Sequence, residues 1–340
     1  MTRDCYFHIL WFLHFTDNDN APDPADPNRD KRWKIKPFLN DLLPRFTAVY
    51  APSQNLSLDE TLIKFKGRVQ FRQFLPSKQS RFRLKGFVIA DASTGYILNT
   101  SIYTGKEGPA ASKDLAMRVV LNLTEQYAHK EYWLFVDSWY ISVPCFLELE
   151  RSIHVLTSGA VRSNRKFLPK EIVDQQHEQV KRLKRGDSLF RQSSNVIRCT
   201  WKDKKTVHLL STIPEDLEIG QVERRLRSEG QWQTKNFTQP KLIKLYNSNM
   251  GGVDLSDQRI TTCFRLMKGN NYLVLQNFLS YAWSSSAQCT HHVPRSWPPR
   301  CQPWWLQRVT CGTAHWRKLF PSRHLVMECA WTCSSTSTIQ

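Results

Sequence analysis

The ten residues Leu56–Phe65, LSLDETLIKF, place two acids inside an otherwise apolar stretch. Thr, Ile and Phe predict a β-strand, whose side chains alternate between the two faces of a sheet. Asp59 and its neighbour Glu60 should therefore point to opposite faces. Asp59 is then either a strand acid beside a basic residue or a ligand in a site, and the rest of the chain bears on that choice.

Segments of the same kind follow this strand. FRQFL, RLKGFVIAD and YILNTSIYT are rich in Val, Ile, Phe and Tyr and are bounded by turn residues such as Ser93-Thr94-Gly95. A helix is predicted over residues 111–127, a short strand at Tyr132–Asp137, a second helix in SWYISVPCFLELE and a further strand in IHVLTSGAV. Because strands alternate with helices, the sequence predicts a mixed α/β sheet.

Composition divides the chain around this α/β unit. Residues 1–55 are predicted to form a helical region, in which Pro44 should kink or end the second amphipathic helix. Residues 163–239 are basic and contain short strands. They predict a mostly-β subdomain, inserted into a core that residues 56–162 and 240–282 form together.

Residues 283–340 differ from everything before them. They contain one acid, Glu328, and six of the chain's 12 tryptophans, and their proline clusters exclude long helices or strands. Their cysteines and histidines lack the paired short spacing of a zinc site. We expect a tail of separate origin, from a shifted reading frame or an exonised segment. The first residues already carry an apolar stripe, which indicates that further sequence lay upstream in the ancestor of this chain.

The chain is strongly basic, with 48 Lys and Arg against 30 Asp and Glu and a net charge of +18. The basic residues are spread along the chain rather than packed into one amphipathic helix, which favours nucleic acid over a membrane surface as the partner. No apolar run approaches the roughly 18 residues that span a bilayer. Nine cysteines without CxxC spacing argue against a secreted disulfide framework and for a reducing intracellular compartment.

Three aspartates stand where an α/β sheet positions ligands. Asp59 lies in the first strand, Asp137 ends the run YWLFVD, and Asp254 follows two glycines in NMGGVDLSDQ. Strand ends and helix starts at one edge of a sheet converge, and phosphodiester chemistry often uses two divalent cations held by carboxylates. Other interpretations stay open, since Asp137 could cap the following helix and Asp254 could simply favour a helix dipole. We interpret Asp91, which ends FVIAD, as a turn acid.

Several motifs, in this order, resemble the transposase domain of the piggyBac superfamily: LSLDETLIKFKGR, FRQFLPSKQSRFRLKGF, YTGKEG, VDSWYIS, GAVRSNRK and NSNMGGVDLSDQ. The resemblance covers roughly residues 1–262 and implies a ribonuclease-H-like catalytic fold. It implies that Asp59, Asp137 and Asp254 hold two Mg²⁺ or Mn²⁺ ions, one to activate water or a 3′-OH and one to stabilise the leaving oxygen. Asp257 matches a fourth acid of the family and is a further expected metal ligand. Family members cut transposon ends through hairpin intermediates and join them at TTAA targets.

The sequence also departs from the family. Ser138 stands where the family usually has Asn, the family normally carries a longer N-terminal region, and residues 283–340 do not look like its Cys-rich zinc module. We expect a piggyBac-type DNA transposase-derived protein in the nucleus. The alternative is a catalytically silent, domesticated or truncated nuclear DNA-binding protein, and an RNA-directed nuclease on the same fold fits the motifs less well. DNA is the expected partner, a homodimer stays open, and neither a membrane nor a small-molecule substrate is expected.

Basic residues interleaved with Phe surround the first strands, and others open the inserted segment. We interpret these charges as phosphate contacts beside the metal site, and the alternative is an ordinary solvated strand face. The predicted DNA-binding residues are Lys66, Arg68, Arg72, Lys78, Arg81, Lys85, Arg162, Arg165 and Lys166.

Overall fold

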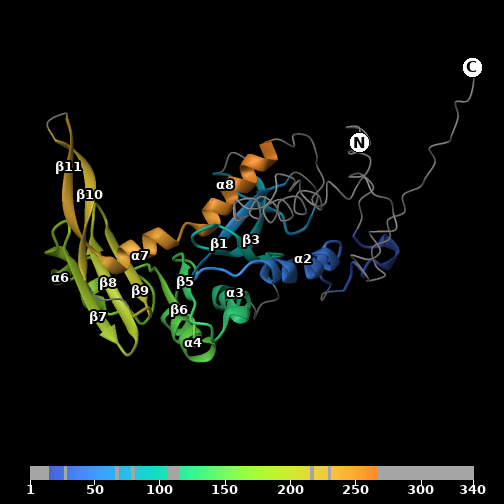
Figure 1. The fold of residues 1–340 in the computed structure, drawn as a ribbon, viewed down its shortest axis with the longest axis horizontal. Helices are drawn as coiled ribbons and strands as arrows, with labels where there is room; N and C mark the ends of the chain where they lie inside the picture. Colours follow the sequence, from blue (N-terminus) through green and yellow to red (C-terminus); the bar gives the residue numbers. More distant parts are fainter. Residues whose placement is uncertain are drawn as a thin grey trace, which may run out of the picture.

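The structure is a computed structural model, and the ribbon is drawn in Figure 1. It describes residues 15–26, 29–65, 69–77, 81–105, 115–214, 218–228 and 231–265. The predicted apolar stripe near the N-terminus and the tail of residues 283–340 lie outside the described residues.

The described strands form a nine-stranded sheet and a separate two-stranded ribbon. In the sheet the order is β2-β3-β1-β5-β6-β9-β8-β7, and β4 also pairs with β3. The strands of the sheet are β1 (Asn55–Lys64), β2 (Gln73–Phe74), β3 (Phe82–Asp91), β4 (Ile97–Ile102), β5 (Trp133–Val136), β6 (Leu156–Ala160), β7 (Ser188–Ser193), β8 (Val196–Lys202) and β9 (Thr206–Ser211). The ribbon consists of β10 (Ile219–Ser228) and β11 (Gln231–Pro240).

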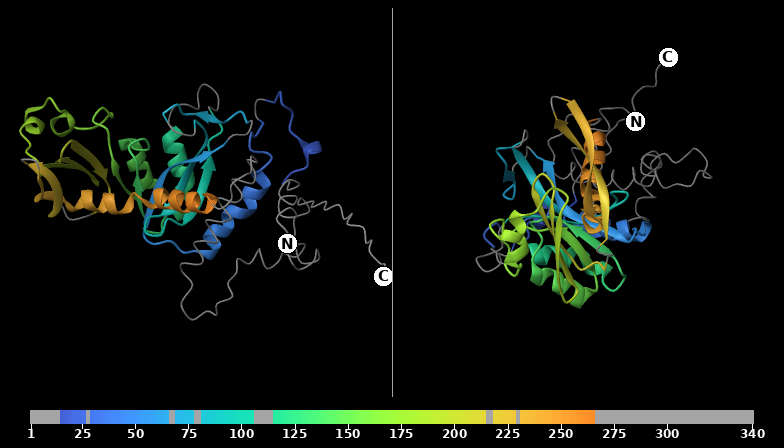
Figure 2. Two further views of the ribbon diagram at one scale, coloured as in Figure 1. Left: turned by 90° about the horizontal axis from the view of Figure 1, so that it is seen from above. Right: turned by 90° about the vertical axis from the view of Figure 1, so that its left-hand side faces the viewer.

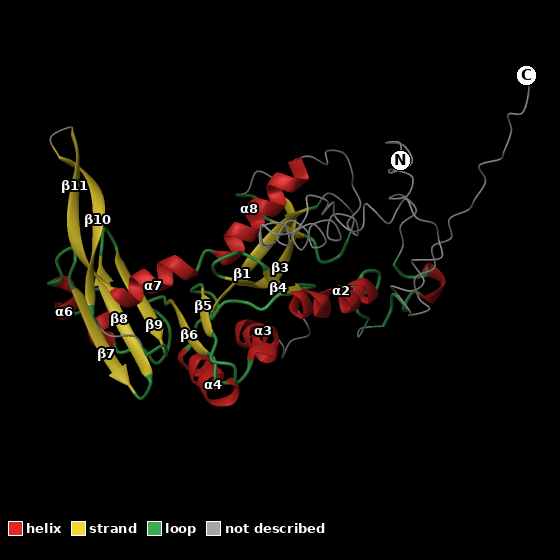
Figure 3. Ribbon diagram, viewed as in Figure 1, coloured by secondary structure: helices red, strands yellow, loops and turns green. Residues whose placement is uncertain are grey.

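Helices precede, interrupt and follow the strands, as Figure 3 shows by colour. The two longest in the described part, α2 and α8, have 14 residues each. No helix of the described residues is long and apolar enough to cross a bilayer. The helices are η1 (Asn18–Asn20), α2 (Lys36–Val49), α3 (Leu115–Thr124), η2 (Glu125–Tyr127), α4 (Val143–Ile153), α5 (Lys170–Val173), α6 (Glu178–Lys181), α7 (Lys241–Asn249) and α8 (Gly252–Arg265).

Strand β1 lies in the middle of the sheet. It pairs antiparallel with β3 and parallel with β5, β5 pairs parallel with β6, and β9 pairs antiparallel with β6. The predicted mixed α/β sheet is therefore confirmed, and the segments predicted as strands and helices between residues 56 and 162 appear in the expected order.

The two faces of β1 have different coverings. Leu56 and Leu58 are fully buried in the main apolar core, which α3 and α4 complete with residues such as Val120 and Phe146. The opposite face of β1 is polar and lies under α8, which contacts β1 and β3. The sheet thus has α3 and α4 on one side and α8 on the other (Figure 1).

The strands within residues 163–239 are not isolated from the main sheet. Because β9 is hydrogen-bonded to β6, strands β7 to β9 continue the sheet that starts at β2. A second apolar cluster, with Trp201, Leu209 and Ile243 among its members, joins this part of the sheet to α7. The ribbon β10–β11 projects beyond the sheet in Figure 1 and in the right-hand view of Figure 2.

Helix α2 excludes one of the two effects expected of Pro44. The helix does not end at Pro44 but continues through it to Val49. A proline inside a helix removes one backbone hydrogen bond. Leu39 and Phe46, on either side of it, are buried at 8% and 2% exposure, so that packing of both halves outweighs the lost bond.

Candidate active site

The pairing of β1 with β5 brings the first two predicted acids together. The last register pair of these parallel strands is Leu58 with Val136. Asp59 and Asp137 each follow directly, so they stand at neighbouring positions beyond that pair. In adjacent strands such positions present side chains to the same face. The two carboxylates therefore share the face of the sheet that carries α8.

Gly252 brings the third acid to this face, because it lets the start of α8 lie directly on the sheet. A Cβ atom at Gly252 would come within 2.8 Å of the Asp91 carbonyl oxygen and 3.0 Å of the Ala92 Cα, and would overlap the Ser57 hydroxyl. Gly251, by contrast, has open space around it. The second glycine of NMGGVDLSDQ thus sets the approach of the helix that carries Asp254.

The turn between β3 and β4 packs against the same helix, α8. Gly95 has a φ of +66°, and a Cβ there would lie 2.9 Å from the carbonyl oxygen of Gly252. Arg259, two turns along α8, donates a hydrogen bond to the carbonyl oxygen of Thr94. Close backbone packing and this hydrogen bond together fix the orientation of α8 over β1.

Asp257 is attached to β1 directly. The Thr61 hydroxyl donates a 2.6 Å hydrogen bond to its Oδ1 atom. Burial raises the pKa of Asp257, the hydrogen bond from Thr61 opposes this rise, and the charge of Asp254 adds to it. Ser57, Asp59 and Thr61 alternate along one face of β1. The acids of α8 therefore lie along a polar stripe of that strand.

The three predicted acids interact electrostatically. Burial raises the pKa of Asp59 to about 6, and the negative charges of Asp137, Glu60 and Asp254 raise it further against the effect of a hydrogen bond from the Glu60 amide. A charge raises the pKa of a carboxyl in this way only when it lies nearby. Asp137 and Asp254 therefore both lie close enough to Asp59 to act on it, and we call these three acids the charged cluster.

Two tyrosines line the same cluster. Burial raises the pKa of Tyr246, on α7, to about 12, and the charges of Asp137 and Asp59 contribute. Burial and the same two acids also raise the pKa of Tyr140. Both phenols therefore stay protonated at neutral pH. They lie close enough to the carboxylates for the negative charges to raise their pKa.

Comparisons with known proteins decide the family. The Transposase IS4 family model matches residues 1–283. Human PiggyBac transposable element-derived protein 3 is 27% identical over 297 residues, which are 82% of this chain and 47% of that protein. Human PiggyBac transposable element-derived protein 2 is 25% identical over 323 residues, which are 92% of this chain and 49% of that protein. The chain belongs to the piggyBac superfamily. It spans about half the length of these two relatives.

A solved structure supports the fold of this piggyBac superfamily chain. The cryo-EM structure of a piggyBac transposase synaptic complex with hairpin DNA matches with a TM-score of 0.69 and 23% identity, over 86% of this chain and 58% of that one. The predicted ribonuclease-H-like fold is confirmed by this match and by the sheet itself.

The acids of this piggyBac-type chain fit a divalent cation by their chemistry. Mg²⁺ prefers oxygen ligands and usually takes one or two carboxylates from the protein, and transposases of this type generally use a divalent metal. Burial is the largest cause of the raised pKa of Asp59, and the nearby negative charges, which a bound cation would offset, add to it. No group of three or more His, Cys, Asp or Glu side chains in the described ranges is arranged to hold a metal ion. Carboxylate oxygens are thus the right kind of ligand for a divalent cation. The ligand roles of Asp59, Asp137, Asp254 and Asp257 stay predictions.

Two alternative interpretations of single acids can now be judged. Asp137 does not cap a helix, because α4 begins at Val143 and Ser142 accepts the capping hydrogen bond from Cys145.

Asp91 is the turn acid that the sequence predicted. Its carboxylate is buried and accepts hydrogen bonds from the backbone amides of Ser53 and Thr94 and from Ser93, which lower its pKa against the effect of burial.

The predicted DNA-binding residues are dispersed. Lys66, Arg68 and Lys78 lie outside the described residues. Arg81, Arg162 and Lys166 are exposed, and the Arg72 guanidinium lies 3.9 Å from the centre of the Phe82 ring. No contact with nucleic acid is part of the structure, so these roles stay predictions.

Lys85 and Arg165, two further residues of this set, also have partners inside the protein. Lys85 forms an ion pair with Glu60, on the face of β1 opposite to Asp59, and its ammonium lies 5.0 Å from the Trp139 ring centre. Arg165 donates hydrogen bonds to the carbonyl oxygens of Ser138 and Trp139, at 3.0 and 3.1 Å. Arg165 thus supports the turn that follows Asp137, which sequence reasoning did not foresee.

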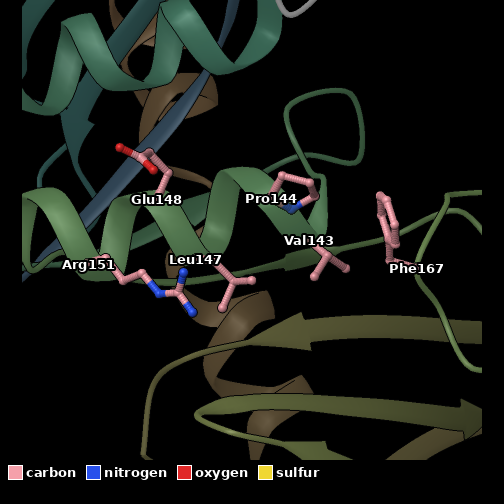
Figure 4. Close-up of a pocket in the computed structure, with 6 residues that line it drawn as sticks. All are labelled: Val143, Pro144, Leu147, Glu148, Arg151 and Phe167. Atoms are coloured by element: carbon pink, nitrogen blue, oxygen red, sulfur yellow. The ribbon is translucent and has the colours of Figure 1, made fainter.

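A shallow pocket lies apart from the acids. It has a volume of about 380 Å³ and is lined by Val143, Pro144, Leu147, Glu148, Arg151 and Phe167. Figure 4 shows Phe167 facing the start of α4 from a neighbouring loop, with the charged groups of Glu148 and Arg151 further along the helix. None of the predicted site residues lines this pocket.

Asp59→Asn is expected to stabilise the metal-free protein at neutral pH. The folded-state pKa of Asp59, about 6, lies above the ordinary value of 3.8 for an aspartate, so the folded protein holds this proton more tightly than the unfolded chain. The stability that the proton contributes is present below about pH 4 and is lost as the pH rises through 6. At pH 8 the variant should gain about 1–2 kcal/mol after solvent screening, and at pH 4 almost nothing.

Urea unfolding in EDTA at both pH values measures this difference. Asp41→Asn is the matched control, since Asp41 pairs with Arg45 on the surface of α2 and its removal should bring no gain. An Asp59→Asn variant with the same unfolding free energy as the wild type at pH 8 would contradict this account, because the charged Asp59 carboxylate would then cost the folded protein nothing.

Proposed function

We propose that this protein is a piggyBac-type, transposase-derived enzyme that cuts and joins DNA strands. The observation that carries the proposal is that Asp137, which follows β5, and Asp254, on α8, both act on the buried Asp59 of β1, on a ribonuclease-H-like sheet. DNA as the partner is supported by the net charge of +18 and by the hairpin DNA in the complex of the matching transposase.

In this proposal the acids bind divalent cations, Mg²⁺ or Mn²⁺. When bound, such a cation would lower the pKa of an attacking water or hydroxyl and neutralise charge on the phosphate. The chain's own residues position the acids: Gly252 seats α8 on β1, Thr61 holds Asp257, and Arg165 supports the turn after Asp137. A homodimer and a nuclear location, where the DNA substrate would be found, are part of the same proposal.

A second candidate is a DNA-binding protein without catalysis. One observation favours it, namely that no metal-holding group of three such side chains is found in the described part of the chain. Relatives named as transposable element-derived proteins are consistent with either candidate.

Nicking of supercoiled plasmid DNA separates the two candidates. The purified full chain, incubated with Mn²⁺ or Mg²⁺, is expected to convert the plasmid to nicked or linear forms and to be inactive in EDTA. Electrophoretic mobility shifts of the same DNA report binding. Binding without nicking under every cation condition would exclude the enzyme and leave the second candidate.

A further inference from the structure

The ribbon β10–β11 has one face that the proposed chemistry does not use. In its antiparallel register Arg225 lies opposite Thr234, and Arg227 lies opposite Trp232. Register partners project to the same face of a ribbon. We call this the outer face, and its exposed residues are Glu223, Arg225, Arg227, Trp232, Thr234 and Asn236.

The other face anchors the ribbon to the body of the protein. Val222 packs against the second apolar cluster, and Arg224 forms a 3.1 Å ion pair with Asp203. The Arg185 guanidinium lies 4.4 Å from the centre of the Phe237 ring. Because these contacts all lie on the inner face or at the base, the outer face is held toward solvent.

The outer face combines free positive charge with one large exposed ring. Trp232 is 71% exposed. Neither Arg225 nor Arg227 has an ion-pair or hydrogen-bond partner within the part of the chain that the structure describes. The two strands carry four basic residues and one acid, while Glu229, between them in the sequence, is outside the described residues. This pattern suits a polyanion with planar apolar groups.

The exposed ring indicates which form of nucleic acid fits. Aromatic side chains bind single strands by stacking on bases, whereas bases inside a duplex already stack on one another. Trp232 therefore gains most from an unpaired base. A protein interface fits less well, since Trp232 is the single large apolar side chain of the outer face and two unpaired charges lie beside it.

The position of the ribbon also favours a role near the acids. Helix α7 connects β11 to α8, and its nine residues span about 14 Å. The ribbon and α8 rise from the same side of the sheet in Figure 1 and in the right-hand view of Figure 2. Trp232 stands eight residues before the end of β11, about 26 Å of strand, so an unpaired DNA segment has to extend several nucleotides from the carboxylates to reach it.

We propose that the outer face of the β10–β11 ribbon binds an unpaired segment of DNA. Arg225 and Arg227 contact its phosphates, and the Trp232 ring stacks on one base. The choice of DNA rests on the proposed function, while the preference for an unpaired segment rests on the ribbon itself.

Fluorescence anisotropy with a labelled 20-nucleotide single strand and the corresponding blunt duplex tests the proposal, with the full chain in EDTA so that no cleavage contributes. Trp232→Ala should weaken binding of the single strand about tenfold and binding of the duplex less than threefold. Trp232→Tyr, which keeps a ring, should restore most of the single-strand affinity. Arg225→Ala/Arg227→Ala should weaken both and lower the salt-dependence slope for the single strand by about 1.4.

The matched control is Lys130→Ala/Arg151→Ala, which removes the same charge near η2 and α4, on the other side of the sheet. It should change either affinity less than threefold.

An equal loss in the control, or a Trp232→Ala variant with unchanged single-strand affinity, overturns the proposal. So does a Trp232→Ala variant that binds DNA normally but loses self-association in sedimentation, since the ribbon would then be an interface between copies. None of these results depends on catalysis, so a failure here is distinct from an absence of nicking.

Discussion

Gly252→Ala should destabilise the protein by about 3 kcal/mol, and Gly251→Ala by less than about 0.5 kcal/mol. The two glycines are adjacent, yet a Cβ at Gly252 would meet the Asp91 carbonyl and the Ala92 backbone within 3.0 Å, while one at Gly251 meets nothing within 4 Å. Backbone atoms cannot move aside as a flexible side chain does. Helix α8 would therefore have to lift from β1, and Asp254 would leave the cluster with it.

Thermal unfolding of the two variants measures this contrast. Gly252→Ala is expected to lower the midpoint by about 8 °C, and Gly251→Ala, on an exposed residue before the helix, to leave it almost unchanged. Gly251→Ala is also the control for any general effect of adding a methyl group in this segment. Equal midpoints for both variants would mean that α8 does not pack on β1 as described.

The elements around the acids could be predicted from the sequence because their signals are local. LSLDETLIKF alternates apolar and polar residues, which predicts β1 and separates Asp59 from Glu60. The Gly-Gly pair followed by acids predicts the start of α8. Asp91 precedes Ser-Thr-Gly, whose short polar side chains form the hydrogen-bonded turn that the structure contains. The same alternation that predicts β1 could also have pointed to Thr61, which shares a face with Asp59 and holds Asp257.

Features that depend on contacts between distant segments could not be predicted in this way. No local pattern shows that β9 pairs with β6 and extends the main sheet. Arg165 looks like any exposed basic residue in the sequence, but the fold places it against the turn after Asp137. Pro44 has a strong helix-breaking propensity, which the buried side chains around it override. Tertiary packing decides each of these cases.

Replacement of all three central acids should abolish cation binding. Burial raises the pKa of Asp59 to about 6 and the charges of Asp137 and Asp254 add to this rise, and a divalent cation would offset those charges. Asparagine keeps the shape of each side chain and removes its charge. Since hard cations such as Mg²⁺ and Mn²⁺ depend on carboxylate ligands, the triple variant should lose affinity even if it stays folded.

Isothermal calorimetry with Mn²⁺ is the most direct measurement, made on the full chain, on Asp59→Asn/Asp137→Asn/Asp254→Asn, and on a control that removes three exposed acids, Asp17→Asn/Asp23→Asn/Asp174→Asn. We predict millimolar or tighter binding to the wild type and to the control, and none to the triple site variant. The same heats for all three proteins, or no binding to any, would contradict a carboxylate metal site at the junction of β1, β5 and α8.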